Sequence, residues 1–177
     1  MRQPSAQWVS PVAGRPTDFR NLIDTLARSR VEFILIGGVA ATLHGSARAT
    51  LDLDVVYRRS RDNVDRLVRA LAPLSPYLRG APAGLPFVFD ADTVRRGLNF
   101  TLDTSLGALD LLGEVTGGGS YDALLSRTET VELFGHPCQA VTLDTLILLK
   151  RAAGRPKDNE VLAELEALRD RPKPTNR

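Results

Sequence analysis

Two carboxylates separated by a single residue, Asp52 and Asp54, are the side chains of this sequence best spaced for metal chemistry. Apolar residues alternate with them at Leu51, Leu53 and Val55, which is the period-two pattern of a strand. Side chains two positions apart on a strand point to the same face, with Cα atoms roughly 6.5 to 7 Å apart. Both carboxylates would therefore reach the same hard divalent cation. An Asp-x-Asp pair alone is more often a solvated polar strand face. The neighbouring residues therefore decide whether the pair is interpreted as a metal site.

A pair of glycines lies upstream of these aspartates, between an apolar run and a short helical segment. The run Phe33 to Ile36 is typical of a buried strand, Gly37 and Gly38 follow it, and residues 39–44 favour a helix that stops at Gly45. A helix start after such a turn presents backbone N–H groups that can cradle phosphate, and glycine lets a phosphate approach the backbone closely.

Together, the glycines and the aspartates resemble a known signature. Gly37 and Gly38, thirteen further residues, and Asp-Leu-Asp-Val from Asp52 to Val55 resemble the signature of the nucleotidyltransferase-fold superfamily. That superfamily includes DNA polymerase beta, antibiotic nucleotidyltransferases and many bacterial toxins. The resemblance implies that the glycines hold a nucleoside triphosphate and that Asp52 and Asp54 bind two divalent metal ions, usually Mg²⁺, with Mn²⁺ as an alternative. It also implies an α/β (α+β) fold, with a mixed, mostly antiparallel β-sheet flanked by helices.

The superfamily carries a third carboxylate on a later strand, and Asp110 in the apolar run 108–112 is the best match. An acid among apolar residues is costly to bury without a partner, which a metal would provide, although an acid on an edge strand would simply face water. Asp103 is the rival, but its hydroxyl- and glycine-rich surroundings are more typical of a turn. Two metal ions held by such acids would activate an attacking hydroxyl and neutralise a leaving pyrophosphate, with Asp110 as general base.

The segment between the glycines and the aspartates contains a second resemblance. It reads His-Gly-Ser-Ala-Arg-Ala-Thr from His44 to Thr50 and resembles the His-Gly-x-x-Arg-x-Thr segment of small bacterial members of the superfamily. The resemblance implies that Arg48 faces the triphosphate or steadies the acids. A surface arginine is an equally good interpretation, because arginine is so frequent in this chain. We expect His44 to pack at a helix end rather than to catalyse.

Near the end of the chain, Lys150, Arg155, Lys157 and Asp158 are spaced as Lys-x-x-x-x-Arg-x-Lys-Asp. This spacing is similar to an element of AbiEii-type abortive-infection toxins and related toxin nucleotidyltransferases, which we expect to be the nearest relatives. The similarity implies that Lys150 contacts phosphate as part of the catalytic machinery, and that Asp158 positions Lys150 or the substrate in the nucleotide site. The alternative is a helix C-terminus that favours cations, with Asp158 in the first turn of the next helix.

Further elements must position these side chains. Apolar spacing predicts helices over residues 17–30 and 143–153, with Thr17 and Thr142 as N-caps, over 62–72, and over a last segment ending near 168. Strands are predicted over 33–36, 51–56, 87–89, 98–102 and 108–112, the last two paired through a turn, and in a hairpin of 130–134 with 138–141. Residues 75–86 and 117–119 are predicted loops.

The chain has 177 residues, 43% of them hydrophobic, which suffices for one core of ordinary size. We expect an irregular arm over residues 1–16, a single nucleotidyltransferase-like domain over 17–170 and a basic tail over 171–177. The formal charge of +2 is too weak to indicate nucleic-acid binding by itself. The single cysteine, Cys138, excludes an internal disulfide, and no segment reads as a signal peptide or membrane span. We therefore expect a cytoplasmic protein without a membrane partner.

The expected reaction is metal-dependent transfer of a nucleoside monophosphate from a nucleoside triphosphate, such as ATP, to an acceptor hydroxyl, with release of pyrophosphate. The acceptor would be RNA, such as tRNA, or a protein. The chain would then be the toxin of a toxin–antitoxin or abortive-infection system, with a cognate antitoxin as partner. The alternatives are an antibiotic nucleotidyltransferase and a nucleotide- or partner-binding module without turnover. Five arginines would either track an RNA backbone or be ordinary surface residues: Arg58, Arg59, Arg61, Arg95 and Arg96.

Overall fold

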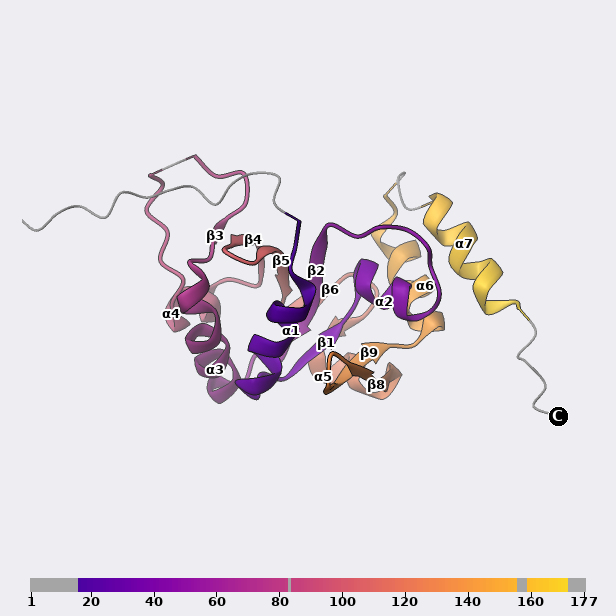
Figure 1. Ribbon diagram of the computed structural model, residues 1–177, viewed down its shortest axis with the longest axis horizontal. Coiled ribbons are helices and arrows are strands. Elements are labelled where there is room, and N and C mark those ends of the chain that lie inside the picture. The colour runs from indigo at the N-terminus through magenta and orange to yellow at the C-terminus, as the bar shows by residue number, and fades with distance from the viewer. Residues whose placement is uncertain (1–15, 83, 156–158, 172–177) are drawn as a thin grey trace, which may run out of the picture.

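The computed structural model describes residues 16–82, 84–155 and 159–171 (Figure 1). The expected N-terminal arm before Pro16, the residues Lys157 and Asp158, and the expected basic tail beyond Arg171 lie outside these ranges. Within the described ranges, no helix combines the length and the apolar character needed to cross a membrane.

One sheet forms the centre of the described structure. Its strands are β1 (Phe33–Leu35), β2 (Asp52–Tyr57), β3 (Tyr77–Leu78), β4 (Asn99–Thr104), β5 (Gly107–Leu112), β8 (Thr128–Leu133) and β9 (His136–Val141). Their order in the sheet is β3-β4-β5-β2-β1-β9-β8. β2 pairs in parallel with β5 and β1 with β9, and the other neighbouring pairs are antiparallel. This mixed, mostly antiparallel sheet confirms the predicted fold class.

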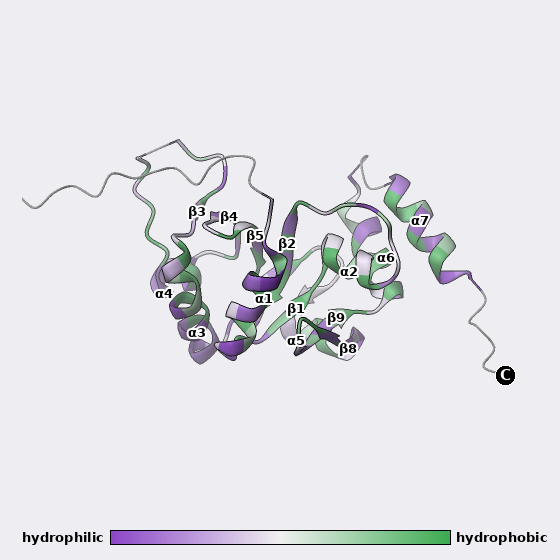
Figure 2. Cartoon of the chain, viewed as in Figure 1, coloured by the Kyte–Doolittle hydropathy of each residue, from purple (hydrophilic) through white to green (hydrophobic). Residues whose placement is uncertain are grey.

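Helices cover the sheet in two groups, each around its own apolar core. The first core receives side chains from α1 (Phe19–Arg28), α3 (Arg61–Leu71) and α4 (Ala91–Arg96). The second receives them from α5 (Tyr121–Leu124), α6 (Leu143–Ala153) and α7 (Asn159–Arg169). The helix α2 (Gly37–Leu43) contributes to both cores, with Val39 in the first and Ala40 and Ala41 in the second. Figure 2 shows β1, in the middle of the molecule, as hydrophobic, while hydrophilic residues gather on the outer turns of α3.

Alternation along the strands decides which face each side chain reaches. Leu53 and Val55 of β2 belong to the first core, whereas Val56 belongs to the second. Side chains two residues apart share a face, so Asp52 and Asp54 point to the same side as Val56. The two aspartates therefore lie on the face of the second core, where β2 begins.

The first helix begins one residue later than predicted. Asp18 is the N-cap of α1, because its carboxylate accepts the N–H of Asn21 at 3.0 Å. Thr17 instead joins the residue before β2 to β5: its hydroxyl donates to the carbonyl of Leu51 at 2.5 Å and accepts the N–H of Ala108 at 3.1 Å. The prediction of Thr17 as the cap was wrong. Thr17 and Asp18 are both good N-cap residues in sequence, and the contacts of the Thr17 hydroxyl with Leu51 and Ala108 leave Asp18 as the cap.

Residues 87–89 form no strand, contrary to the prediction. The rings of Phe87 and Phe89 pack in series between Tyr77 and Phe100, with two edge contacts and one tilted contact at centroid distances of 6.1 to 6.5 Å. Short aromatic runs look alike whether they pair as strands or pack as rings. The helix α4 that follows, capped by Asp90, was not predicted.

Two predicted loops contain short strands, and the short helix α5 was not predicted. The stretch around residues 117–119 is the hairpin of β6 (Glu114–Val115) and β7 (Gly119–Ser120), and β3 lies within residues 75–86. The hairpins β4–β5 and β8–β9 form as predicted. Thr142 caps α6 by accepting the N–H of Thr145 at 3.3 Å.

Candidate functional site

Three carboxylates from two neighbouring strands meet on the face of the second core. Asp52 and Asp54 of β2 and Asp110 of β5 each offer one oxygen, and these oxygens lie within 4.8 Å of one another. The parallel register places Asp54 directly opposite Asp110, and Asp52 opposite Ala108. We call these three residues the acidic cluster. Of the two rivals for the third carboxylate, the structure places Asp110 in the cluster, whereas Asp103 lies on β4.

The glycine turn packs directly against this cluster. Gly37 has a φ of +62°, and a Cβ added to it would lie 2.0 Å from Oδ2 of Asp54. A Cβ on Gly38 would lie 2.2 Å from the hydroxyl oxygen of Thr50. The N–H of Gly38 donates a hydrogen bond to the Asp54 carboxylate, which lowers the pKa of that carboxyl. Glycine is thus required at both positions so that the start of α2 can approach the aspartate strand.

Burial and mutual repulsion make the cluster unfavourable when all of its carboxylates are charged. Burial, followed by the charges of Asp52 and Asp110, raises the pKa of Asp54 to about 7, against the smaller opposing effects of the Gly38 N–H and the charge of Lys150. Burial also raises the pKa of Asp110, and the guanidinium of Arg79 opposes this shift. A divalent cation would remove both causes, since it replaces the lost solvation and offsets the repulsion.

The donor set fits a hard divalent cation. Carboxylate oxygens are the ligands that Mg²⁺ and Mn²⁺ prefer in proteins. Among the described residues, Asp110 Oδ1 is buried and, apart from an ion pair with Arg79, has no hydrogen-bond partner. A carboxylate oxygen engaged by one ion pair keeps a further lone pair that can bind a metal ion. Asp52, Asp54 and Asp110 would hold the metal.

Comparison with known proteins identifies the fold that carries this acidic cluster. No protein-family model matches the chain, and no curated protein matches it. Its structure is similar to the lincosamide antibiotic adenylyltransferase LnuA with lincomycin bound, with a TM-score of 0.57 at 12% identity over 87% of this chain and 99% of LnuA. It is also similar to a candidate nucleotidyltransferase from Thermotoga maritima, with a TM-score of 0.53 at 16% identity over 86% of this chain and 91% of the other. The chain has the nucleotidyltransferase fold.

A third similar structure is that of ANT(2″)-Ia in complex with adenylyl-2″-tobramycin. Its TM-score is 0.50 at 13% identity, over 84% of this chain and 83% of the other. At these identities the similarities show the fold, which confirms the resemblance at that level. On this nucleotidyltransferase fold, the acidic cluster is a set of carboxylates that could hold a divalent cation.

Two other predicted site residues, Lys150 and Arg48, lie in different parts of the structure. The positive charge of Lys150, on α6, lowers the pKa of Asp54, so this lysine is near enough to act on the cluster. Arg48 forms ion pairs with α7 instead, at 2.8 Å to Glu164 and 3.3 Å to Glu160. These pairs connect the loop before β2 to the last helix and support the interpretation of Arg48 as a surface residue.

His44 occupies a helix end, as predicted. Its Nε2 lies 2.8 Å from the carbonyl oxygen of Val141, so the ring joins the end of α2 to β9. Asp158, the remaining predicted nucleotide-site residue, lies outside the described residues.

Two arginines near the cluster were missing from the predicted site. Arg79 forms ion pairs with Asp52 and Asp110, and Arg155 lowers the pKa of Asp110 through its charge. Arg155 was visible in sequence as part of the motif that contains Lys150. Arg79 follows a two-residue strand in a stretch that reads as loop, so its only signal would have been the pairing of β3 with β4, which is not local in sequence.

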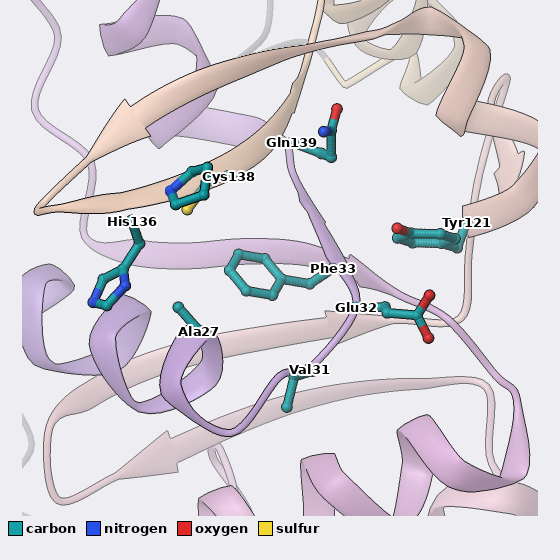
Figure 3. Close-up of a pocket in the computed structure, with 9 residues that line it drawn as sticks. Ala27, Val31, Glu32, Phe33, Tyr121, His136, Cys138 and Gln139 are labelled. Atoms are coloured by element: carbon teal, nitrogen blue, oxygen red, sulfur yellow. The ribbon is translucent and has the colours of Figure 1, made fainter.

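A cavity of about 290 Å³ lies near the start of β1 and contains no residue of the acidic cluster (Figure 3). Figure 3 shows Glu32, Phe33, Tyr121 and His136 around it. Because the glycine turn and the cluster adjoin the other end of β1, this cavity is separate from the candidate site.

The raised pKa of Asp54 predicts how the stability of the metal-free protein depends on pH. The folded pKa of about 7 lies above the value of roughly 3.9 in an unfolded chain. The folded state therefore binds the proton more tightly, and its stability is lost as the pH rises through this window. In a metal chelator, we expect the melting temperature of the wild type, relative to that of Asp54→Asn, to fall between pH 5 and pH 8. Parallel pH profiles of the two proteins would contradict the expected shift.

Proposed function

We propose that this protein is a metal-dependent nucleotidyltransferase that moves a nucleoside monophosphate from a nucleoside triphosphate, ATP among the candidates, to an acceptor hydroxyl. The observation that carries the proposal is the juxtaposition of Asp52, Asp54 and Asp110 with the turn at Gly37 and Gly38. A metal-holding carboxylate cluster beside a glycine-lined helix start provides for both parts of a metal–triphosphate substrate.

Each part of the proposed site has a role in this reaction. Asp52, Asp54 and Asp110 would hold Mg²⁺, as one or two ions, or Mn²⁺. The bound metal would lower the pKa of the acceptor hydroxyl and neutralise charge on the departing pyrophosphate. The acceptor oxygen forms a bond to the α-phosphorus, the bond from that phosphorus to the β-phosphate oxygen breaks, and Asp110 takes the hydroxyl proton. The glycine turn leaves room for the phosphates, and Lys150 offsets their charge.

The acceptor we propose first is a macromolecule, either RNA such as tRNA or a protein, which would make the chain a toxin related to the AbiEii type with a cognate antitoxin. A cytoplasmic location would suit this role. The arginines considered for an RNA backbone are mostly engaged within the fold. Arg58 pairs with Glu32 and Asp122, and Arg59 donates to the carbonyls of Arg95 and Gly97. These contacts weigh against RNA as the acceptor and leave a protein acceptor unaffected.

A small hydroxylated antibiotic is the second candidate acceptor, and the comparisons favour it specifically. Two of the similar structures described above hold antibiotics: lincomycin in LnuA and adenylylated tobramycin in ANT(2″)-Ia. The similarity extends over 99% of the LnuA chain, so this chain lacks little of the fold on which that reaction takes place.

The test is incubation of the protein with each α-labelled nucleoside triphosphate and Mg²⁺, in three sets of reactions containing total RNA, cell protein, or a panel of lincosamides and aminoglycosides. We expect labelled product and pyrophosphate in one set, and neither when a chelator is present. The set that becomes labelled identifies the acceptor class. Failure of all triphosphates to yield Mg²⁺-dependent product would leave a binding module without turnover and overturn the proposal.

A further inference from the structure

The guanidinium of Arg79 lies among three carboxylates that come from three different strands. Its NH2 is 2.9 Å from Oδ1 of Asp110 on β5, its NH1 is 3.5 Å from Oδ2 of Asp52 on β2, and its Nε is 3.2 Å from Oδ1 of Asp103 on β4. The side chain is 28% exposed. Two of its three acidic partners belong to the acidic cluster, so the arginine binds at the place where a metal would bind.

Contacts with β4 would hold Arg79 there even if its ion pairs with the cluster were broken. Its backbone N–H donates to the carbonyl of Thr101 at 2.9 Å, and its NH2 donates to the carbonyl of Leu102 at 2.9 Å. The pairing of β3 with β4 places Tyr77 opposite Asp103, and the Nε of Arg79 reaches back to that aspartate. None of these groups belongs to the acidic cluster. Asp103, the rejected rival for the third metal ligand, thus acquires a role as the anchor of this arginine.

We propose that Arg79 is a built-in counter-cation that competes with the divalent metal for Asp52 and Asp110. This inference rests on the metal site of the proposed function. Without metal, the guanidinium offsets the repulsion among the carboxylates. A divalent cation must displace it from Asp110 Oδ1 or bind within a few ångströms of its positive charge, and either event weakens the binding of metal alone.

Competition of this kind couples the binding of metal to the binding of nucleotide. A guanidinium released from Asp52 and Asp110 remains anchored at Asp103, with its planar fork free to pair with phosphate oxygens. A triphosphate brings negative charge that both the metal and Arg79 can share. Metal bound together with a triphosphate would therefore escape the penalty that metal alone experiences.

The test is a calorimetric titration with Mn²⁺ alone, without nucleotide, of the wild type and four variants. We expect Arg79→Gln to bind Mn²⁺ more tightly than the wild type, on the order of tenfold, the factor for removing one positive charge a few ångströms from a dication in a water-accessible site. Arg79→Lys keeps the charge but cannot span the same carboxylates, so its affinity should fall in between. Arg95→Gln is the matched control, because Arg95 also bridges two aspartates, Asp65 and Asp92, but does so on α3 and α4. Its affinity should equal that of the wild type.

The outcomes separate this inference from the proposed function. If the wild type binds Mn²⁺ more tightly than Asp54→Asn, the metal site stands; if the two bind equally, the metal site and the proposed function fail together. Given a working metal site, equal or weaker binding by Arg79→Gln would show that Arg79 positions the carboxylates instead of competing with the metal, and would overturn the inference. If Arg79→Gln does not fold, Arg79→Lys decides: tighter binding than wild type supports competition, and equal or weaker binding refutes it.

Discussion

Asp54→Asn is expected to lose nucleotidyl transfer almost completely, on the order of a thousandfold or more, while the protein stays folded. Bound metal provides several kcal/mol of charge stabilisation in the transition state, and each 1.4 kcal/mol corresponds to about a factor of ten in rate. The same substitution should stabilise the metal-free protein at pH 8, by roughly 2 to 4 kcal/mol, because it removes a buried charge whose pKa is raised to about 7. Activity and stability thus change in opposite directions, which unfolding cannot produce.

Two measurements on the same preparations check this expectation: pyrophosphate release with Mg²⁺, and thermal melting in a chelator. Asp92→Asn is a suitable control, since Asp92 is an exposed carboxylate on α4 that pairs with Arg95. It should retain wild-type transfer. Asp110→Asn should match Asp54→Asn, whereas Asp103→Asn should lose far less activity. Equal losses for Asp103→Asn and Asp110→Asn would make Asp103 a metal ligand, against the geometry described above.

The parts of the acidic cluster that depend on neighbouring residues in the sequence were predictable. The alternation of apolar residues around Asp52 and Asp54 predicts both the strand and the shared face, because strand geometry has a period of two residues. The glycine turn was equally visible, since the change from an apolar run to a helix at Gly37 is a local pattern. Asp110 stood out as an acid among apolar residues. Its position opposite Asp54, however, depends on a parallel pairing between strands that are more than fifty residues apart.

What escaped prediction depends on contacts between distant segments. Arg79 reaches the cluster only because a two-residue edge strand pairs with β4. Arg48 lies in a motif typical of the superfamily, yet its charge is satisfied by Glu160 and Glu164 of the last helix. Arginines are so common in this chain that their identity carries little information, and only the fold tells which of them meet carboxylates of the site.

Gly37→Ala should cut transfer by roughly a hundredfold and remove the rise in melting temperature that Mn²⁺ produces in the wild type. The added methyl group would lie 2.0 Å from Oδ2 and 2.6 Å from Cγ of Asp54, so either the carboxylate or the start of α2 must move. A displacement of about 1 Å at a reacting centre is enough for a loss of this size. The backbone adds strain of its own, because a φ of +62° costs a residue with a Cβ about 1 to 2 kcal/mol.

Gly135→Ala separates these two effects. Gly135, in the turn between β8 and β9, has a φ of +84°, and an added Cβ would meet nothing within 4 Å. This control therefore carries the backbone strain without the collision, and we expect it to lower stability by about 1 kcal/mol while leaving transfer and the Mn²⁺ response intact. Retained activity in Gly37→Ala would mean that the glycine turn and Asp54 can move apart without loss of function, which would contradict a role for their close contact in the reaction. Loss in Gly37→Ala alone would assign the effect to the contact between the glycine turn and the carboxylate, since the strain is common to both variants.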